Sequence, residues 1–379
     1  AGAADFWSIV PAGTDSLKKI DHYTIVRELG RGAMGVVYVA RDGKVDRDVA
    51  LKIMQSGLLN ELGLRRFRQE AQAVAKLRHP GIVTIHHLSV FQGRPYLVMD
   101  LVDGESLHHR LQAKGALEPK LAAKVAGSLA DALAHAHSRG ILHRDVKPAN
   151  VLIAASGHTV LTDFGLAKDL SASREQLTLS GHVVGTPGYL SPEQGRGAIH
   201  EVDVRSDVYG LGATLYAMLT GQGPFRGNAA ELVKLVLHER PAAPSTLNPG
   251  VPRDLEAICL KCLEKQREDR YATVNELALD LKHFLDGERV NASARRVRVK
   301  PQTLGLGAVV VASLSLVLGV ALMPSPKKIE LPTPSSASVE TPKKTALSPA
   351  ERVEADTKLR RRERATEPLK RIELAKKWL

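Results

Sequence analysis

The sequence at residues 141–153 reads I-L-H-R-D-V-K-P-A-N-V-L-I and is followed by a D-F-G that starts at Asp163. Two short apolar runs, I-L at 141–142 and V-L-I at 151–153, enclose a carboxylate at Asp145, an ammonium at Lys147 and a carboxamide at Asn150. Phosphoryl transfer needs a carboxylate that orients a hydroxyl, a cation near the moving group and oxygen ligands for magnesium. The stretch therefore predicts a catalytic loop rather than a charged turn.

A glycine motif lies upstream, between two strand-like stretches. Gly30, Gly32 and Gly35 follow Y-T-I-V-R-E-L and precede V-V-Y. Glycines at this spacing let a backbone lie directly over phosphates, because no side chain holds it away. A dinucleotide-binding motif would lie between a strand and a helix, so this one favours a loop that covers a nucleotide.

Lys52 interrupts the apolar strand V-A-L-K-I at 49–53. A lysine in such a strand lies at an exposed edge or faces an anion. Because it follows a glycine-rich hairpin, we expect it to face a phosphate.

These motifs resemble the eukaryotic-type (Hanks-type) serine/threonine protein kinases. The sequence at 254–285 and the order of kinase domain, linker and apolar span resemble their bacterial transmembrane receptor-like subgroup. The resemblance covers roughly residues 23–286 and implies an α+β, bilobal fold with a small β-rich N-lobe and a larger helical C-lobe. It implies ATP and Mg²⁺ (or Mn²⁺) as cofactors and proteins with Ser or Thr as substrates. Asp145 would be the catalytic base, and Lys147 in D-V-K-P-A-N is typical of serine/threonine rather than tyrosine kinases.

The resemblance also assigns a nucleotide site. Lys52 would bind the α and β phosphates, held by Glu70 of the helical segment 64–77, while Asn150 and Asp163 would hold the metal. The residues expected around the nucleotide are Leu29, Gly30, Gly32, Gly35, Val37, Ala50, Lys52, Met99, Asp100, Val102 and Leu152.

Within that set, the stretch at 96–102 would connect the two lobes. Met99 would lie at the back of the adenine pocket, and the backbone of Asp100 and Val102 would bind the adenine edge. The ring would be sandwiched by Val37, Ala50 and Leu152.

A hydroxyl-rich segment between Gly165 and Glu193 ends in G-T-P-G-Y-L-S-P-E. Thr186 would line the site for the substrate hydroxyl. Thr178 and Ser180 are the predicted phosphorylation sites, because a phosphate there would suit the guanidinium of Arg144. We expect autophosphorylation between two chains of a homodimer to order the segment.

Two acidic residues have predicted structural roles. Glu193, in S-P-E where many kinases have A-P-E, would pair with Arg270 of E-D-R-Y. Asp207 starts an apolar helix and would tie it back to the catalytic loop.

The net charge of +12 raises the question of a nucleic-acid partner. From Glu288 onward there are 19 Lys and Arg against 9 Asp and Glu, so most of the charge lies in the tail. A nucleic-acid enzyme would carry basic residues around its groove, and we expect no such partner. The two cysteines, Cys259 and Cys262, have no second ligand pair and are predicted to be buried helix thiols.

Residues 304–323 carry no charge and would span about 30 Å as a helix, the thickness of a bilayer core. They follow a basic segment at 287–303, so the positive-inside rule predicts a single pass through the cell (inner) membrane with the kinase domain cytoplasmic. A Pro/Ser/Thr-rich linker at 324–347 and a basic, helical extracytoplasmic segment at 348–379 would follow. The N-terminal extension at 1–22 shows no secretory signal.

The sequence thus predicts a membrane-anchored signalling kinase that transfers the γ phosphoryl of ATP. Two other functions stay open. A pseudokinase scaffold would normally have lost Lys52, Asp145 or Asp163, and all three are present. A small-molecule phosphotransferase would share the lobes, but the long hydroxyl-rich segment favours a protein substrate.

Overall fold

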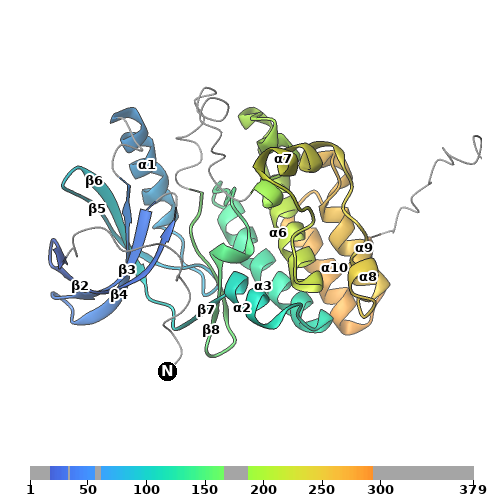
Figure 1. Cartoon of the computed structure of the whole chain (residues 1–379), viewed down its shortest axis with the longest axis horizontal. Coiled ribbons are helices and arrows are strands. Elements are labelled where there is room, and N and C mark those ends of the chain that lie inside the picture. Colours follow the sequence, from blue (N-terminus) through green and yellow to red (C-terminus); the bar gives the residue numbers. More distant parts are fainter. Residues whose placement is uncertain (1–17, 33–34, 56–60, 166–186, 293–379) are drawn as a thin grey trace, which may run out of the picture. The chain divides into compact units, whose positions relative to one another are not determined.

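A computed structural model describes residues 18–32, 35–55, 61–165 and 187–292. All of them belong to the first of the two units into which the chain divides, Ala1–Val297. Figure 1 shows that strands gather in the N-terminal part of this unit and helices in the rest. This is the expected bilobal α+β arrangement.

The N-terminal lobe is a six-stranded antiparallel sheet in the order β1-β2-β3-β4-β6-β5. Its strands are β1 (Lys19–Ile20), β2 (Tyr23–Gly32), β3 (Gly35–Asp42), β4 (Arg47–Met54), β5 (Ile85–Phe91) and β6 (Arg94–Asp100). Side chains alternate between the two faces of a strand. In β4, Leu51 and Ile53 are buried in a cluster of their own, whereas Ala50 belongs to the main core. Lys52 lies between Leu51 and Ile53 in the strand and therefore points to the same face of the sheet as Ala50.

Helix α1 (Glu61–Val74) lies beside this sheet (Figure 1). Its residues Phe67, Ala71 and Val74 are buried, at the i, i+4, i+7 spacing of one helix face. The amphipathic helix predicted from the sequence is therefore present, and it carries Glu70 next to its buried face.

The C-terminal lobe is mainly helical. Its α-helices are α2 (Leu107–Lys114), α3 (Pro119–His137), α5 (Pro192–Gly195), α6 (Val204–Thr220), α7 (Ala229–His238), α8 (Pro244–Leu247), α9 (Arg253–Cys262) and α10 (Val274–Asp286). Short 3-10 turns are η1 (Pro148–Asn150), η2 (Pro187–Tyr189), η3 (Ile199–Glu201) and η4 (Arg267–Asp269). A small sheet of β7 (Gly104–Ser106), β8 (Val151–Ala154) and β9 (Thr159–Leu161) lies where the catalytic loop ends.

Helix α6 forms the centre of this lobe, in contact with α3, α9 and α10. Every residue from Ser206 to Leu219 is buried, as expected for a helix that is apolar on all sides. The Asp203 side chain caps its first turn by accepting a hydrogen bond from Arg205 N, and Gly221 ends it in the left-handed conformation. Asp207 is therefore held in the first turn of a rigid, fully packed element.

Cys259 and Cys262 are both free and fully buried, on the face of α9 that packs against α6. Burial raises the pKa of both thiols. The prediction of buried helix thiols is confirmed, and both thiols are kept protonated.

Helix α10 ends at Asp286, but the chain after it still packs on the domain. The buried Asp280 carboxylate accepts hydrogen bonds from the backbone N–H groups of Asn291 (2.8 Å) and Ala292 (2.9 Å) and from the hydroxyl of Tyr271 (2.7 Å). The first residues of the predicted juxtamembrane segment are therefore part of the folded domain.

No helix among residues 18–32, 35–55, 61–165 and 187–292 is long and apolar enough to cross a bilayer. The predicted span at 304–323 and the segments after it lie outside the described residues. So do Thr178, Ser180 and Thr186 of the hydroxyl-rich segment.

Candidate active site

The catalytic loop runs from the end of α3 to η1 and brings its three predicted side chains together. Oδ2 of Asp145 forms an ion pair with Lys147 Nζ at 2.9 Å and accepts a hydrogen bond from Asn150 Nδ2 at 3.0 Å. The same amide nitrogen also donates to the backbone carbonyl of Asp145 at 2.8 Å. The Asp145 carboxylate is thus oriented by a neighbouring ammonium and by a carboxamide of the following turn.

Asp207 of helix α6 holds the backbone of this loop by hydrogen bonds, as predicted. One of its carboxylate oxygens accepts the backbone N–H of Arg144 (2.7 Å), and the other accepts that of His143 (2.8 Å) and His137 Nε2 (2.8 Å). Burial by itself would raise the pKa of Asp207, but the hydrogen bonds and charges around it, led by His137, hold that pKa below its usual value. The carboxylate stays ionised and fixes the backbone just before Asp145.

His143 joins the loop to the strand that leads to Asp163. Its Nδ1 accepts the backbone N–H of Asp145 at 3.2 Å, so Nε2 must carry the proton that is shared with the carbonyl of Thr162 at 3.0 Å. Burial lowers the pKa of His143, although the Asp207 carboxylate acts in the opposite direction. Both contacts require the neutral imidazole. The ring also packs against Phe164 of the D-F-G, with ring centroids 4.5 Å apart.

Lys52 approaches the site from β4 of the other lobe. Its Nζ lies 2.7 Å from Oδ1 of Asp163, and the two side chains are 14% and 30% exposed. Asp163 has a φ of 56°, in the left-handed region that non-glycine residues seldom adopt, and this turns its carboxylate toward the ammonium.

The sequence predicted that Glu70 would hold Lys52. The ion pair recorded for Lys52 among the described residues is the one with Asp163. The role of Glu70 as a partner of Lys52 stays a prediction.

The glycine motif forms the β2–β3 hairpin, in which Gly30 pairs with Val37 and Gly32 with Gly35. Gly35 shows why a side chain would not fit. Its φ is 158°, and a Cβ there would lie 2.1 Å from the carbonyl oxygen of Ile53. Gly35 is therefore required by the close approach of the neighbouring strand β4, whereas the predicted approach of the glycine backbone to phosphates stays a prediction. Residues 33 and 34 lie outside the described part of the hairpin.

A cleft between the lobes collects most of the predicted nucleotide-binding residues. Its lining includes Leu29, Val37, Ala50, Met99, Asp100, Val102, Leu152 and Asp163. Met99 and Asp100 end strand β6, and the chain then passes through Val102 to the C-terminal lobe. The apolar set comes from both lobes, which suits a flat ring held between two layers.

The comparison with known families agrees with this geometry. Residues 23–281 match the family described as protein kinase domain. The chain belongs to the protein kinase family.

Three bacterial relatives indicate the branch of the kinase family. The serine/threonine-protein kinase PknB of Mycobacterium tuberculosis is 41% identical over 274 residues, covering 71% of this chain and 44% of that protein. The serine/threonine-protein kinase PrkC of Bacillus subtilis is 40% identical over 272 residues, covering 71% and 41%. The probable serine/threonine-protein kinase PknB of Bifidobacterium longum is 40% identical over 276 residues, covering 70% and 40%. This kinase chain spans less than half the length of these relatives, and its matched part is a Hanks-type kinase domain of the bacterial serine/threonine group.

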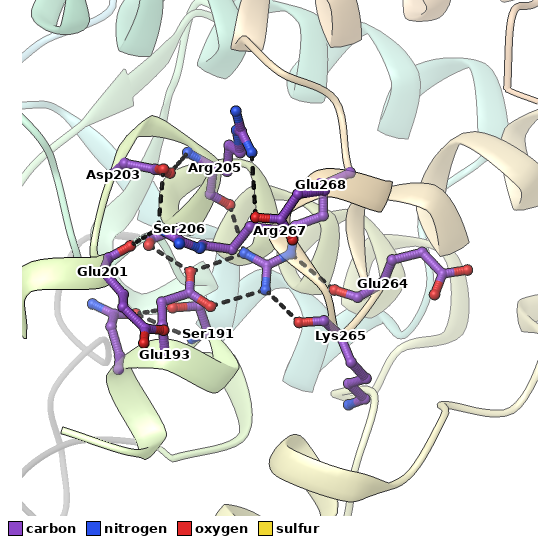
Figure 2. A network of polar contacts seen from close by, with 12 residues as sticks. Ser191, Glu193, Glu201, Asp203, Arg205, Ser206, Glu264, Lys265, Arg267 and Glu268 are labelled. Atoms are coloured by element: carbon purple, nitrogen blue, oxygen red, sulfur yellow. Dashed lines mark hydrogen bonds and ion pairs between the residues drawn. The ribbon is translucent and has the colours of Figure 1, made fainter. Parts of the chain in front are cut away.

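The predicted Glu193–Arg270 ion pair is present in the kinase domain and is completely buried, with both side chains 0% exposed. The two guanidinium nitrogens of Arg270 each donate to one carboxylate oxygen at 2.9 Å, and Ser206 Oγ donates to Glu193 at 2.6 Å. Figure 2 shows Glu193 and Ser206 in this network, with Glu264 and Lys265 beside them. Burial would raise the pKa of Glu193, but the hydrogen bond and charge of Arg270 lower it to about 2. The pair anchors the end of the hydroxyl-rich segment to the C-terminal lobe.

The donor set of the kinase site fits a magnesium ion shared with phosphates. Asn150 uses its amide nitrogen on Asp145, so its side-chain carbonyl oxygen is the atom left for a metal. Asp163, which lines the cleft, supplies a carboxylate. In the described ranges no three His, Cys, Asp or Glu side chains gather as a metal site. Magnesium binds nucleotides through one or two protein oxygens, with phosphates and water completing its shell, so two ligands suffice.

Several residues of the kinase site were missed by the sequence analysis. Val83 and Thr162 line the cleft. Each lies in a short apolar stretch of sequence, and neither stretch contains a motif that would identify it as part of a site. His137 contacts Asp207, and Gln194 Nε2 donates to the carbonyl of Arg144 at 2.8 Å. For Gln194 a signal existed, because Ser191 followed three residues later by Gln is a helix-start pattern.

Proposed function

We propose that this chain is an ATP-dependent protein kinase that transfers the γ phosphoryl group to Ser or Thr hydroxyls of proteins. The observation that carries the proposal is the arrangement of one loop in which Lys147 and Asn150 both contact the Asp145 carboxylate. Lys52 also pairs with Asp163, which lines the interlobe cleft. Relatives named serine/threonine-protein kinases support the substrate class.

In the proposed reaction, a substrate hydroxyl approaches Asp145, which orients it and accepts its proton. The bond from the hydroxyl oxygen to the γ phosphorus forms as the bond to the bridging oxygen breaks, and ADP leaves with the electron pair. Lys147 lies 2.9 Å from Asp145 and stabilises negative charge on the transferred group. Lys52 binds the α and β phosphates. Asn150 and Asp163 would hold a magnesium ion, which would supply positive charge against the phosphates.

The same observations bear on the alternatives. A pseudokinase scaffold is disfavoured because Lys52, Asp145 and Asp163 are all present and lie where the chemistry needs them. A small-molecule phosphotransferase is disfavoured by the hydroxyl-rich segment at 166–186 that precedes the buried anchor at Glu193.

Incubation of the purified chain with γ-labelled ATP, magnesium and a generic protein substrate tests the proposal. Label should appear on Ser or Thr of the protein, and none in the matched Asp145→Asn variant. Nucleotide binding without transfer would support the scaffold. Label on an added amino alcohol or aminoglycoside but not on protein would support the small-molecule phosphotransferase.

Membrane anchoring is the second part of the proposal. The support is the charge-free stretch at 304–323 and the Arg and Lys residues before it, which favour a cytoplasmic kinase domain in the cell membrane. Protease treatment of intact cells should remove an epitope placed after Leu379 and spare one placed before Tyr23. The reverse pattern would contradict the orientation, and recovery of the full chain in the soluble fraction would contradict the span.

Control by autophosphorylation is the third part. We expect one chain of a homodimer to phosphorylate Thr178 or Ser180 of the other, and the phosphate to bind Arg144. Replacing both hydroxyl residues by Ala should lower transfer to an added substrate after pre-incubation with ATP. Undiminished activity in the double variant would refute this control.

A further inference from the structure

Gln194 lies in α5, directly after the buried Glu193, and links this short helix to the catalytic loop. Its Nε2 donates to the backbone carbonyl of Arg144 at 2.8 Å. Its Oε1 accepts from both the backbone N–H and the hydroxyl of Ser191, each at 3.1 Å. A backbone N–H can only donate, so these partners define which end of the carboxamide faces the loop. The side chain is partly buried and its orientation is fixed at both ends.

The carbonyl that Gln194 holds belongs to the peptide group between Arg144 and Asp145. The N–H of the same peptide group is Asp145 N, which donates to Nδ1 of His143 at 3.2 Å. This peptide plane is therefore fixed at its oxygen by α5 and at its nitrogen by the catalytic loop. A rotation of this plane would change the ψ of Arg144 and the φ of Asp145, and with them the direction of the Asp145 carboxylate.

The backbone at this point needs such support. Arg144 has a φ of 63°, a left-handed conformation that costs a residue with a Cβ about 1–2 kcal/mol. Its N–H is held by Asp207 at 2.7 Å and its carbonyl by Gln194. Asp207 is anchored in α6, whereas Gln194 is anchored through Glu193 and Arg270. Two separate elements of the C-terminal lobe thus hold one strained residue in place.

We propose that Gln194 is a positioning residue for phosphoryl transfer. Its carboxamide fixes the Arg144–Asp145 peptide group and thereby directs the Asp145 carboxylate toward the substrate hydroxyl. Gln194 directly follows the hydroxyl-rich segment in the chain. Its hydrogen bond to the Arg144 carbonyl therefore makes the orientation of Asp145 depend on the position of the residues that end this segment. The catalytic role of Gln194 rests on the proposed kinase activity. The hydrogen bond by which Gln194 holds the Arg144–Asp145 peptide group does not depend on that activity.

The test uses the full chain and the variants Gln194→Glu and Gln194→Met. Glutamate still accepts from Ser191 N but presents an oxygen to the Arg144 carbonyl, and methionine has a similar volume but loses all three hydrogen bonds of the carboxamide. We expect kcat to fall at least about tenfold in each, because both variants lose the hydrogen bond to the Arg144 carbonyl, with KM for ATP unchanged because the cleft is untouched. Amide hydrogen exchange over residues 141–150 should become about tenfold faster.

Ser191→Ala is the matched control. It removes the hydroxyl contact to Gln194 while leaving the contact of Gln194 Nε2 with Arg144, so kcat and loop exchange should stay close to those of the unmodified chain. Unchanged kcat, or unchanged loop exchange, in Gln194→Glu would overturn the proposal. An equal fall for Ser191→Ala would show a purely structural role for the helix and would also overturn it. If the unmodified chain transferred no phosphate, the proposed function would fail, and the exchange measurement alone would decide whether Gln194 clamps the loop.

Discussion

Two ion pairs of the kinase domain show how the same charges serve different purposes. Lys52 and Asp163 are 14% and 30% exposed and meet across the cleft, with 2.7 Å between Nζ and Oδ1. Glu193 and Arg270 are 0% exposed and meet through two parallel hydrogen bonds. The first pair can exchange its partner for a phosphate or a metal, whereas the second is enclosed by protein.

The two pairs differ in how many hydrogen bonds the cation makes. Arg270 also donates to the backbone carbonyls of Arg205, Glu264 and Lys265, so its fork of donors is satisfied by fixed groups. A buried charge is tolerated only when it is paired and hydrogen-bonded in this way. Lys52 makes one contact with a carboxylate that lines the cleft. The buried pair therefore fixes structure, and the accessible pair is suited to chemistry.

The largest expected effect concerns the accessible charges. Asp145→Asn and Lys52→Met should each lower phosphoryl transfer by about a hundredfold or more, because a base or an electrostatic contact is lost. The thermal midpoint should change little, since neither side chain is in the apolar core. Autophosphorylation near that of the unmodified chain in either variant would show that the assigned role is wrong.

Breaking the buried Glu193–Arg270 pair should instead lower the stability of the domain. Arg270→Met leaves Glu193 as an unpaired buried carboxylate and should lower the free energy of unfolding by about 3–5 kcal/mol. Chemical denaturation measures this loss. The exposed pair Arg196–Glu201 supplies the control, because Arg196→Met removes an ion pair of 3.0 Å at the surface and should cost about 1 kcal/mol or less. Similar losses in the two variants would contradict the distinction between the pairs.

A smaller effect is expected at Asp280, a third buried carboxylate. Asp280→Asn replaces one acceptor oxygen by an amide nitrogen, so at least one of its donors, Tyr271, Asn291 or Ala292, loses its partner. The cost should be about 1–3 kcal/mol in unfolding free energy. Hydrogen exchange at residues 288–292 should accelerate as well. Unchanged exchange there would show that Asp280 does not hold the segment.

The smallest effect is the pH dependence of stability. Burial lowers the pKa of His143 below its usual 6.5. Below pH 6.5 the unfolded chain therefore binds a proton at His143 more readily than the native chain does, and the free energy of unfolding falls as the pH drops. The pKa of Glu193 is about 2 instead of 4.5, so its contribution is complete above pH 4.5 and is lost as pH falls toward 2. Urea denaturation from pH 7 to pH 3 should show both declines. Glu193→Gln should remove only the second, and a curve identical to that of the unmodified chain would contradict the assignment.

The sequence by itself determined the parts whose chemistry is local. The H-R-D-V-K-P-A-N run, the D-F-G, the glycine hairpin and Lys52 each carry their spacing in consecutive residues, and the glycine motif does form a hairpin between two strands. The long-range pairs Glu193–Arg270 and Asp207 with the catalytic loop were also predicted, but through resemblance to a family rather than from the residues alone.

Only the tertiary structure decided which groups meet when several partners are possible. Lys52 and Asp163 come from different lobes, and the structure brings the Asp163 carboxylate to the ammonium, with the Asp163 backbone in the left-handed region. Gln194 could have served only its own helix, yet the strained Arg144 presents a carbonyl to it. Composition and spacing are properties of one stretch of chain. A hydrogen bond between distant stretches depends on backbone directions that the packing of the whole domain establishes.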